Sequence, residues 1–349
     1  MRRRTILATA ALLGSLLFYR YLYPLRHFLS SPREVMRTGG TPRNRSITFK
    51  KDRDSRVFLI EAGDNIKDTI GNALKATDWL KKLEIRGREV LVKPNVNSDD
   101  PHPATTNPEV VRATVELLYE AGARKVVVGD MSGIYWLPTE KSMRRTGIAS
   151  AAEDAGAELA FFEEEEWVKV ELPGDTHLKN LSIPLRVYSA EVLVSLPVVK
   201  THRYATYSMS LKNLVGTISG PDRRRLHTSP YMEEMIAEIS LAVSPDIIIM
   251  DGTRSMVAGG PTRGSVRDTG VIILSRDPVA TDVVGLSIVK SFGEWKPVLN
   301  RSVWHQRQVS RAIALHLGAE HADQLELLPI GESQKFLQLL EAVKKAIRE

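Results

Sequence analysis

Along most of the chain, short runs of β-branched and other apolar residues alternate with stretches whose apolar positions recur every three or four residues. The runs predict buried strands and the stretches predict amphipathic helices. Strands are predicted at residues 57–60, 89–93, 125–129, 191–196, 247–250 and 271–274, with edge strands at 158–162 and 168–172. Helices are predicted at residues 65–83, 109–121, 141–155, 232–243, 277–291 and 334–348. This alternation predicts an α/β fold with a mainly parallel sheet and helices on both faces, and it allows two lobes with a cleft between them.

The N-terminal arm differs from the rest of the chain. Arg2 to Arg4 precede fifteen uncharged residues, Thr5 to Tyr19, which are rich in Ala and Leu. A spanning helix needs roughly 20 apolar residues, so residues 1–25 are expected to be a membrane anchor or a cleaved signal. The arginine pair also resembles a twin-arginine export signal. Residues 26–55 are expected to form a basic tether, and the positive-inside bias places the body on the extracytoplasmic side.

Composition limits the class of protein. The 349 residues are 43% hydrophobic and 26% charged and include no cysteine, which excludes disordered, collagen-like and disulfide-stapled chains. Without cysteine there is no protein-ligated iron–sulfur cluster, no thiolate nucleophile and no Cys-type zinc site. The net charge of the whole chain is +6. Residues 1–56 carry thirteen Lys/Arg and three acids, a net charge of +10, so residues 57–349 have a net charge of −4. A mildly acidic body predicts no nucleic-acid partner.

The body is expected to span residues 56–330, and an amphipathic helix is expected within residues 331–349.

In open α/β sheets, ligands bind beyond the carboxyl ends of strands. Charged or amide residues end or follow four predicted strands. They are Lys93 and Asn95 for the first strand, Asp130 for the second, Lys200 for the third and Asp251 for the fourth. The lysines can hold an anion by charge and the amide can orient it. Two alternatives stay open: lysines that pair with the two aspartates only to satisfy strand ends, and aspartates that ligate a hard metal ion.

Residues 200–227 hold the densest set of chemically useful side chains. His202 is a candidate general acid–base because the ordinary pKa of histidine lies near neutrality. Lys212 lies among Met, Leu and Leu neighbours that could desolvate it and lower its pKa, which suits a nucleophile. A structural role for His202 and His227 is an equally simple interpretation. Arg223 to Arg225 are expected to form a solvent-facing or lid surface rather than a substrate clamp.

Several motifs together resemble the domain of unknown function 362 family over about Arg56 to Glu320. They are Val90–Asn95, Ala104–Val111, Lys200–His202, Ser210–Gly216, Asp251–Gly252 with Gly259–Pro261, and Asp277–Asp282. The resemblance implies little chemistry, because most members have no established activity. Many relatives carry a Cys-rich ferredoxin-like segment that this chain lacks.

A more distant similarity is to nickel-pincer lactate racemase. It implies that His202 is an acid–base, that Lys212 tethers the pincer cofactor and that His227 ligates nickel. The sulfur donors belong to that cofactor, so a cysteine-free chain is compatible with it. The sequence departs from the racemase pattern at several positions, among them Lys93, where an Asp-His-Thr-Arg stretch would be expected, and Asp130, where a His would be.

These observations predict an exported or membrane-anchored protein that binds an anionic small molecule or a cofactor, with a metal or organometallic cofactor among the options. The first hypothesis is an enzyme of isomerase or oxidoreductase type, and the alternative is a non-catalytic binding or scaffold protein at the membrane surface. The predicted site comprises His202 and Lys212 as catalytic residues, Lys93, Asn95, Asp130, Lys200 and Asn213 as cofactor-binding residues, and His227 and Asp251 as metal ligands.

Overall fold

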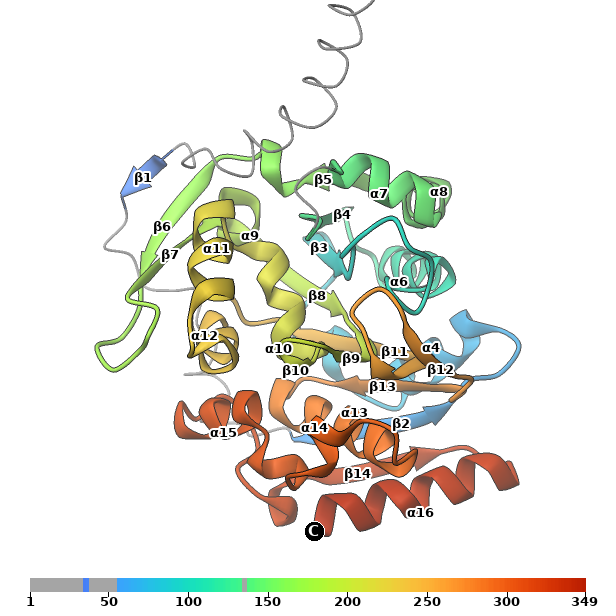
Figure 1. Ribbon diagram of the computed structural model, residues 1–349. Coiled ribbons are helices and arrows are strands. Elements are labelled where there is room, and N and C mark those ends of the chain that lie inside the picture. Colours follow the sequence, from blue (N-terminus) through green and yellow to red (C-terminus); the bar gives the residue numbers. More distant parts are fainter. Residues whose placement is uncertain (1–33, 38–54, 134–136) are drawn as a thin grey trace, which may run out of the picture.

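The computed structural model describes residues 34–37, 55–133 and 137–349. Within these residues, eleven strands form one mixed sheet (Figure 1). Its path runs through β14 (Glu326–Ile330), β2 (Arg56–Glu61), β13 (Val271–Ser275), β11 (Ile247–Gly259), β8 (Val192–Leu196), β3 (Glu89–Pro94), β4 (Lys125–Asp130) and β5 (Glu158–Phe161). Three short strands pair off this path: β9 (Val198–His202), β10 (Thr206–Tyr207) and β12 (Gly264–Arg267). Among the strands on the path, β13 runs antiparallel to both neighbours and the other neighbours pair in parallel.

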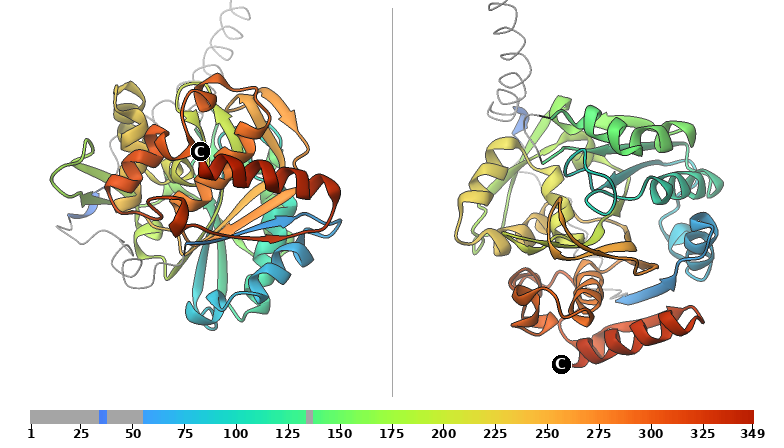
Figure 2. Two further views of the ribbon diagram at one scale, coloured as in Figure 1. Left: turned by 90° about the horizontal axis from the view of Figure 1, so that it is seen from below. Right: turned by 45° about the vertical axis from the view of Figure 1, so that its right-hand side comes forward.

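Helices cover both faces of the sheet, as the sequence predicts (Figure 2). Alternate residues of one strand point to opposite faces, so Val57 and Leu59 join one apolar cluster while Phe58 and Ile60 join the other. The second cluster packs under α4 (Ile66–Lys75), α6 (Pro108–Glu120), α7 (Thr139–Thr146) and α8 (Ile148–Asp154). The first packs under α10 (Ser210–Asn213), α12 (Met232–Glu238), α13 (Pro278–Ser291), α15 (Arg307–Ala314) and α16 (Gln334–Arg348). Further helices are α5 (Trp79–Lys82), α9 (Leu185–Ser189), α11 (Gly220–Thr228) and α14 (Lys296–Leu299).

Two predicted helices are each divided in the structure. The helix predicted over 65–83 becomes α4 and α5, and the side chain of Thr77 bonds to the carbonyl of Leu74 at the break. The helix predicted over 141–155 becomes α7 and α8, because Gly147 ends α7 in the left-handed region with φ of 82°. The strand predicted over 247–250 is longer than expected and extends through Gly259 as β11.

A second, three-stranded sheet lies beside the first. It consists of β1 (Glu34–Arg37), β6 (Trp167–Glu171) and β7 (Asn180–Pro184). The edge strand predicted over 168–172 therefore belongs to this smaller sheet. Residues 34–37 fall inside the predicted tether, yet they pair in parallel with β6. Residues 1–25 lie outside the described residues, so the predicted anchor or signal is untested, as are the two lobes and the cleft.

The C-terminal helix α16 spans the residues predicted for it. Phe336, Leu340 and Val343 are buried, and the helix packs on α13. Leu337 is also apolar, but it is 41% exposed because it lies one residue beyond Phe336 and off the buried face. In the described part of the chain, no helix is long and apolar enough to cross a bilayer.

Candidate functional site

The predicted site begins with an ion pair between two neighbouring parallel strands. Lys93, near the end of β3, places its Nζ 2.6 Å from Oδ1 of Asp130, the last residue of β4. The other oxygen of Asp130 accepts the backbone N–H of Val96 at 2.7 Å. Burial lowers the pKa of Lys93, and the adjacent Asp130 opposes that shift. Among the described residues, Asp130 is thus the one carboxylate in direct contact with Lys93, and both of its oxygens already have a partner.

An amide relay joins this pair to a second buried lysine. Lys200 of β9 donates to Oδ1 of Asn95 and to the carbonyl of Ala104, both at 2.5 Å. The amide of Asn95 in turn donates to Oδ1 of Asn213 at 3.2 Å, which also lies 3.4 Å from Nζ of Lys93. Burial, followed by the charge of Lys212, lowers the pKa of Lys200 to about 7. The structure therefore brings the five predicted cofactor-binding residues into one network.

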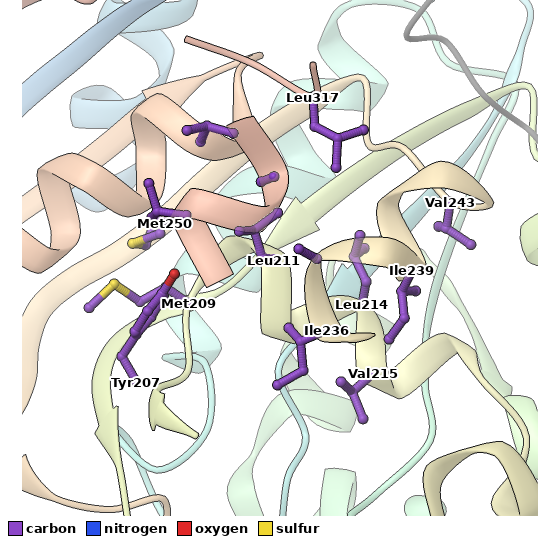
Figure 3. Packing of buried hydrophobic residues seen from close by; sticks show 14 of the residues in the cluster. Tyr207, Met209, Leu211, Leu214, Val215, Ile236, Ile239, Val243, Met250 and Leu317 are labelled. Atoms are coloured by element: carbon purple, nitrogen blue, oxygen red, sulfur yellow. The ribbon is translucent and has the colours of Figure 1, made fainter. Parts of the chain in front are cut away.

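The short helix α10 carries Asn213 into this network and places Lys212 beside it. Its first two N–H groups, on Ser210 and Leu211, bond to the buried carboxyl of Asp282 in α13 at 2.6 and 3.2 Å. Leu211 and Leu214 fill the apolar cluster that also contains Ile236 (Figure 3). Burial raises the pKa of Asp282 to about 8. A helix of four residues has little stability of its own, so these tertiary contacts hold it in place.

Two further contacts fix the position of α10 against the sheet. The side-chain amide of Asn213 donates to the carbonyl of Lys93 at 3.3 Å and to the hydroxyl of Ser195 in β8 at 2.9 Å. Gly216, just after α10, lies against the ion pair: a Cβ there would collide with Oδ1 of Asp130 and come within 2.5 Å of Nζ of Lys93. The Ser210–Gly216 motif thus ends in the residue that lets the backbone approach the pair.

Lys212 has different surroundings from the other lysines. Its side chain is 9% exposed. Among the described residues, none forms a hydrogen bond or an ion pair with its Nζ. Burial, followed by the nearby Arg223, lowers the pKa of Lys212 to about 8. The residue is therefore a buried amine with uncommitted donors.

Two histidines near Lys212 have opposite tautomers. His202 is on the same side of β9 as Lys200, and its Nδ1 accepts the N–H groups of Tyr204 and Ala205, each at 3.1 Å, so the proton is on Nε2. Burial and the charge of Lys212 hold the pKa of His202 far below its ordinary value. It is consequently a neutral hydrogen-bond donor.

His227 has the reverse arrangement. Its Nδ1 lies 2.7 Å from the carbonyl of Arg223, which can only accept, so Nδ1 carries the proton and Nε2 keeps a lone pair. Although the residue as a whole is exposed, desolvation by the surrounding protein and the charge of Lys212 lower the pKa of His227 to about 4. The free Nε2 suits a proton acceptor or a metal ligand.

Arg223 corrects one expectation from the sequence. Arg224 and Arg225 face solvent as predicted, but Arg223 is only 3% exposed. Its guanidinium donates to three carbonyl groups, those of Met131, Ser132 and Ile218, at 2.9, 2.7 and 3.2 Å. Burial lowers the pKa of Arg223 to about 10. Arg223 and the buried Leu226 share one face of α11. This three-residue spacing is the signal that could have identified Arg223 as the buried arginine of the three.

The family comparison covers these same elements. The model of the family described as domain of unknown function (DUF362) matches residues 90–287, more than half of the chain. The chain belongs to the DUF362 family. A curated relative, the thylakoid-associated protein sll1697 of Synechocystis sp., is 28% identical to this DUF362 chain over 217 residues. That match covers 58% of the chain and 64% of the relative, so the chain spans less than two thirds of the relative's length.

Asp251 of this DUF362 protein takes no part in the network. Its oxygens accept the N–H of Asn107 at 2.9 Å and both the N–H and the hydroxyl of Thr253, at 3.0 and 2.7 Å. Nδ1 of His102 lies 3.2 Å from the same carboxylate. Asp251 therefore secures the loop that precedes α6, and the alternative that it pairs with Lys200 is wrong.

No group of three His, Cys, Asp or Glu side chains in the described segments of the DUF362 chain is arranged to hold a metal ion. The metal roles of His227 and Asp251 remain predictions. Two surface hollows, one around Arg186 and one around Arg112, contain none of the predicted site residues.

Proposed function

We propose that this DUF362 protein binds a small anionic molecule among Lys93, Lys200, Lys212 and Arg223, which we name the cationic cluster. The observation that supports this is an excess of buried positive charge. Asp130 is paired with Lys93, while Lys200 and Arg223 bond to neutral oxygens and Lys212 to none, as far as the structure describes the chain. A buried charge without a counterion costs several kcal/mol, and an anionic guest would offset that cost.

We further propose that the site acts on its ligand by proton transfer, as an isomerase. The neutral Nε2–H of His202 can donate to a carbonyl oxygen and so polarise it, and the free Nε2 of His227 can accept a proton. An isomerisation needs one group that stabilises negative charge on oxygen and another that takes the proton. These two imidazoles, both of which feel the charge of Lys212, supply both functions.

Calorimetric titration of the full chain with oxalate, phosphate and sulfate tests the binding. We expect at least one of these anions to bind, with an affinity that falls as salt increases. Lys200→Met removes one charged donor and should weaken binding about tenfold or more, because a hydrogen bond to a charged group is worth about 1.5–3 kcal/mol. Lys67→Met is the matched control, since Lys67 pairs with Glu116 and Glu120 on the surface.

Absence of binding for all three anions at low salt would count against the anion site. Equal losses of anion affinity in the Lys200 and Lys67 variants would show that affinity depends only on the net charge of the protein. Native mass spectrometry and elemental analysis of protein purified from its own host would identify a resident ligand or metal directly.

A second candidate function is attachment of the body to a membrane. The relative is named as thylakoid-associated, and the N-terminal residues of this chain have the basic start and apolar run of an anchor or export signal. We propose that residues 1–25 attach the protein to a membrane with its body on the extracytoplasmic side. Flotation of the full chain and of a chain lacking residues 1–25 with lipid vesicles tests attachment, and protease digestion of intact cells of the host tests the side. Equal flotation of both chains would contradict the proposal.

A further inference from the structure

We propose that the amine of Lys212 forms an imine with the carbonyl carbon of a small oxo acid, that is, a carboxylate that also carries an aldehyde or ketone group. This inference rests on the anion site proposed above and specifies the chemical class of its ligand.

The members of the cationic cluster differ in their hydrogen bonding. Lys93 is bonded to Asp130, Lys200 to Asn95 and Arg223 to three carbonyl groups. In the described structure, Lys212 is the member of the cluster without a partner. A nucleophile needs a lone pair that no other group occupies, and Lys212 meets that condition.

The three lysines of the cluster also differ in their access to solvent. Lys93 is 1% exposed and Lys200 is fully buried, whereas Lys212 retains 9% exposure and lies near the exposed His227. A small molecule that enters from solvent therefore meets Lys212 before the deeper lysines. Those deeper cations are then placed to attract its carboxylate.

The surroundings of Lys212 also favour the neutral form of its amine. Arg223 is the charged group that acts on Lys212. The acids of the region act on its neighbours instead, Asp130 and Asp100 on Lys200 and Glu163 on Arg223, so none of them stabilises a charged Lys212. With the pKa of Lys212 lowered to about 8, about one molecule in ten has a neutral amine at pH 7. An ordinary exposed lysine has far less.

Imine formation begins when the lone pair of Nζ forms a bond to the carbonyl carbon. The π-electron pair of the carbonyl moves to its oxygen, where the Nε2–H of His202 stabilises the negative charge. A proton then neutralises this oxygen. The nitrogen loses two protons in all, one of which His227 Nε2 can accept, and the oxygen leaves as water. Amine and carbonyl thus give imine and water without an oxidant or reductant. The imine withdraws electrons from the neighbouring carbon, which favours the proton transfer proposed for the site.

Reductive trapping tests the imine. The full chain is incubated with glyoxylate and cyanoborohydride, and the modified lysines are located by peptide mass spectrometry. We expect a carboxymethyl group on Lys212 at a level at least tenfold above that on Lys67. The ion pairs of Lys67 with Glu120 and Glu116 raise its pKa and make it a poor nucleophile. Lys212→Arg should remove the main modification, and Lys67→Arg should leave it unchanged.

Oxalate separates this inference from the proposed function, because it has the charge of an oxo acid but no reactive carbonyl. Oxalate binding without trapping at Lys212 would overturn the imine and keep the anion site. Trapping at Lys212 with glyoxylate and equally with acetaldehyde, without oxalate binding, would keep the amine chemistry and overturn the anion site. Modification spread over exposed lysines in proportion to their exposure would overturn the imine. If Lys212→Arg does not fold, the map of the wild-type chain alone decides.

Discussion

Lys212 lowers the stability of the folded protein near neutral pH. In the folded state its pKa is about 8, below the ordinary 10.5 of a lysine, so burial penalises the charged form. Stability increases with pH wherever the unfolded chain binds more protons than the folded one. For Lys212, stability therefore increases between about pH 8 and the ordinary lysine pKa of 10.5. Below pH 8 the whole destabilisation by the buried charge is present.

Lys212→Met should therefore stabilise the protein at pH 7. The expected gain is about 3 kcal/mol, because each pKa unit corresponds to about 1.4 kcal/mol. The gain should decrease as the pH is raised from 8 toward 10, because the folded amine is then neutral while the unfolded amine, with its ordinary pKa of 10.5, progressively loses its proton as well. Urea unfolding of both proteins at pH 7, 8.5 and 10 measures this difference. A gain that stays constant over the range would contradict a buried charge at Lys212.

The Lys93–Asp130 pair gives a second prediction. Removal of one partner of a buried pair leaves an uncompensated charge, so Lys93→Met or Asp130→Asn should each destabilise by about 3–5 kcal/mol. The double substitution should cost less than the sum of the single ones. Urea unfolding of the four proteins completes the cycle, and additive costs would show that the two side chains do not interact.

The rule for strand ends predicts most of the network, but it also predicts Asp251, which bonds to Asn107 and Thr253 instead. Lys93, Asn95, Asp130 and Lys200 follow directly from the rule that strand ends face ligands, and the structure joins them. Arg223 could not be placed in the same way, because a run of three arginines is usually solvent-facing and only the short helix α11 turns one of them inward.

The loop after α10 determines how closely that element approaches the sheet. Gly216→Ala should destabilise the protein by about 1–3 kcal/mol or more, since the added methyl group overlaps with the Lys93–Asp130 pair. Gly174→Ala is the matched control because nothing lies within 4 Å of a Cβ there. Thermal unfolding of both variants should show a large loss only for Gly216. Equal small losses would mean that the pair shifts freely to admit the methyl group.

Long elements could be predicted from their apolar pattern, whereas short ones in the site could not. Strands β3, β4 and β8 are continuous apolar runs. Segment 198–228 instead contains β9, β10, α10 and α11, and of these only the nine-residue α11 is long enough to show a spacing, that of Arg223 and Leu226. The start of α10 depends on Asp282, which is 72 residues away from Ser210 in sequence. Such distant contacts leave no local signal.

At the scale of the whole molecule, the C-terminal segment adds both a strand and a helix to the body. Leu340→Ala should destabilise by about 2–5 kcal/mol because Leu340 is buried against the core. Leu337→Ala on the same helix should change stability by about 0.5 kcal/mol or less, since that side chain is partly in solvent. Thermal unfolding compares the two. Similar losses would indicate that α16 does not rest on α13 through this face.

The α/β class and the helices on both faces could be predicted from the alternation of apolar runs and helical periods. The antiparallel strand β13, the smaller sheet and the parallel pairing of β14 with β2 could not. These features depend on which strands meet across long stretches of sequence, and an apolar run specifies burial without specifying its neighbour.

The position of β2 has a consequence for the order of folding. This early strand lies between β13 and β14, so both of its partners are encoded late, and Ser275 bonds to the carbonyl of Arg56 across 219 residues. Closing so large a loop costs chain entropy before any contact is gained, and topologies of this kind fold slowly. Until then, the apolar stretch Val57 to Ile60 has an unpaired edge and is open to association with other chains. We therefore expect a chaperone that covers this stretch while the later strands form to reduce such association of the newly made protein.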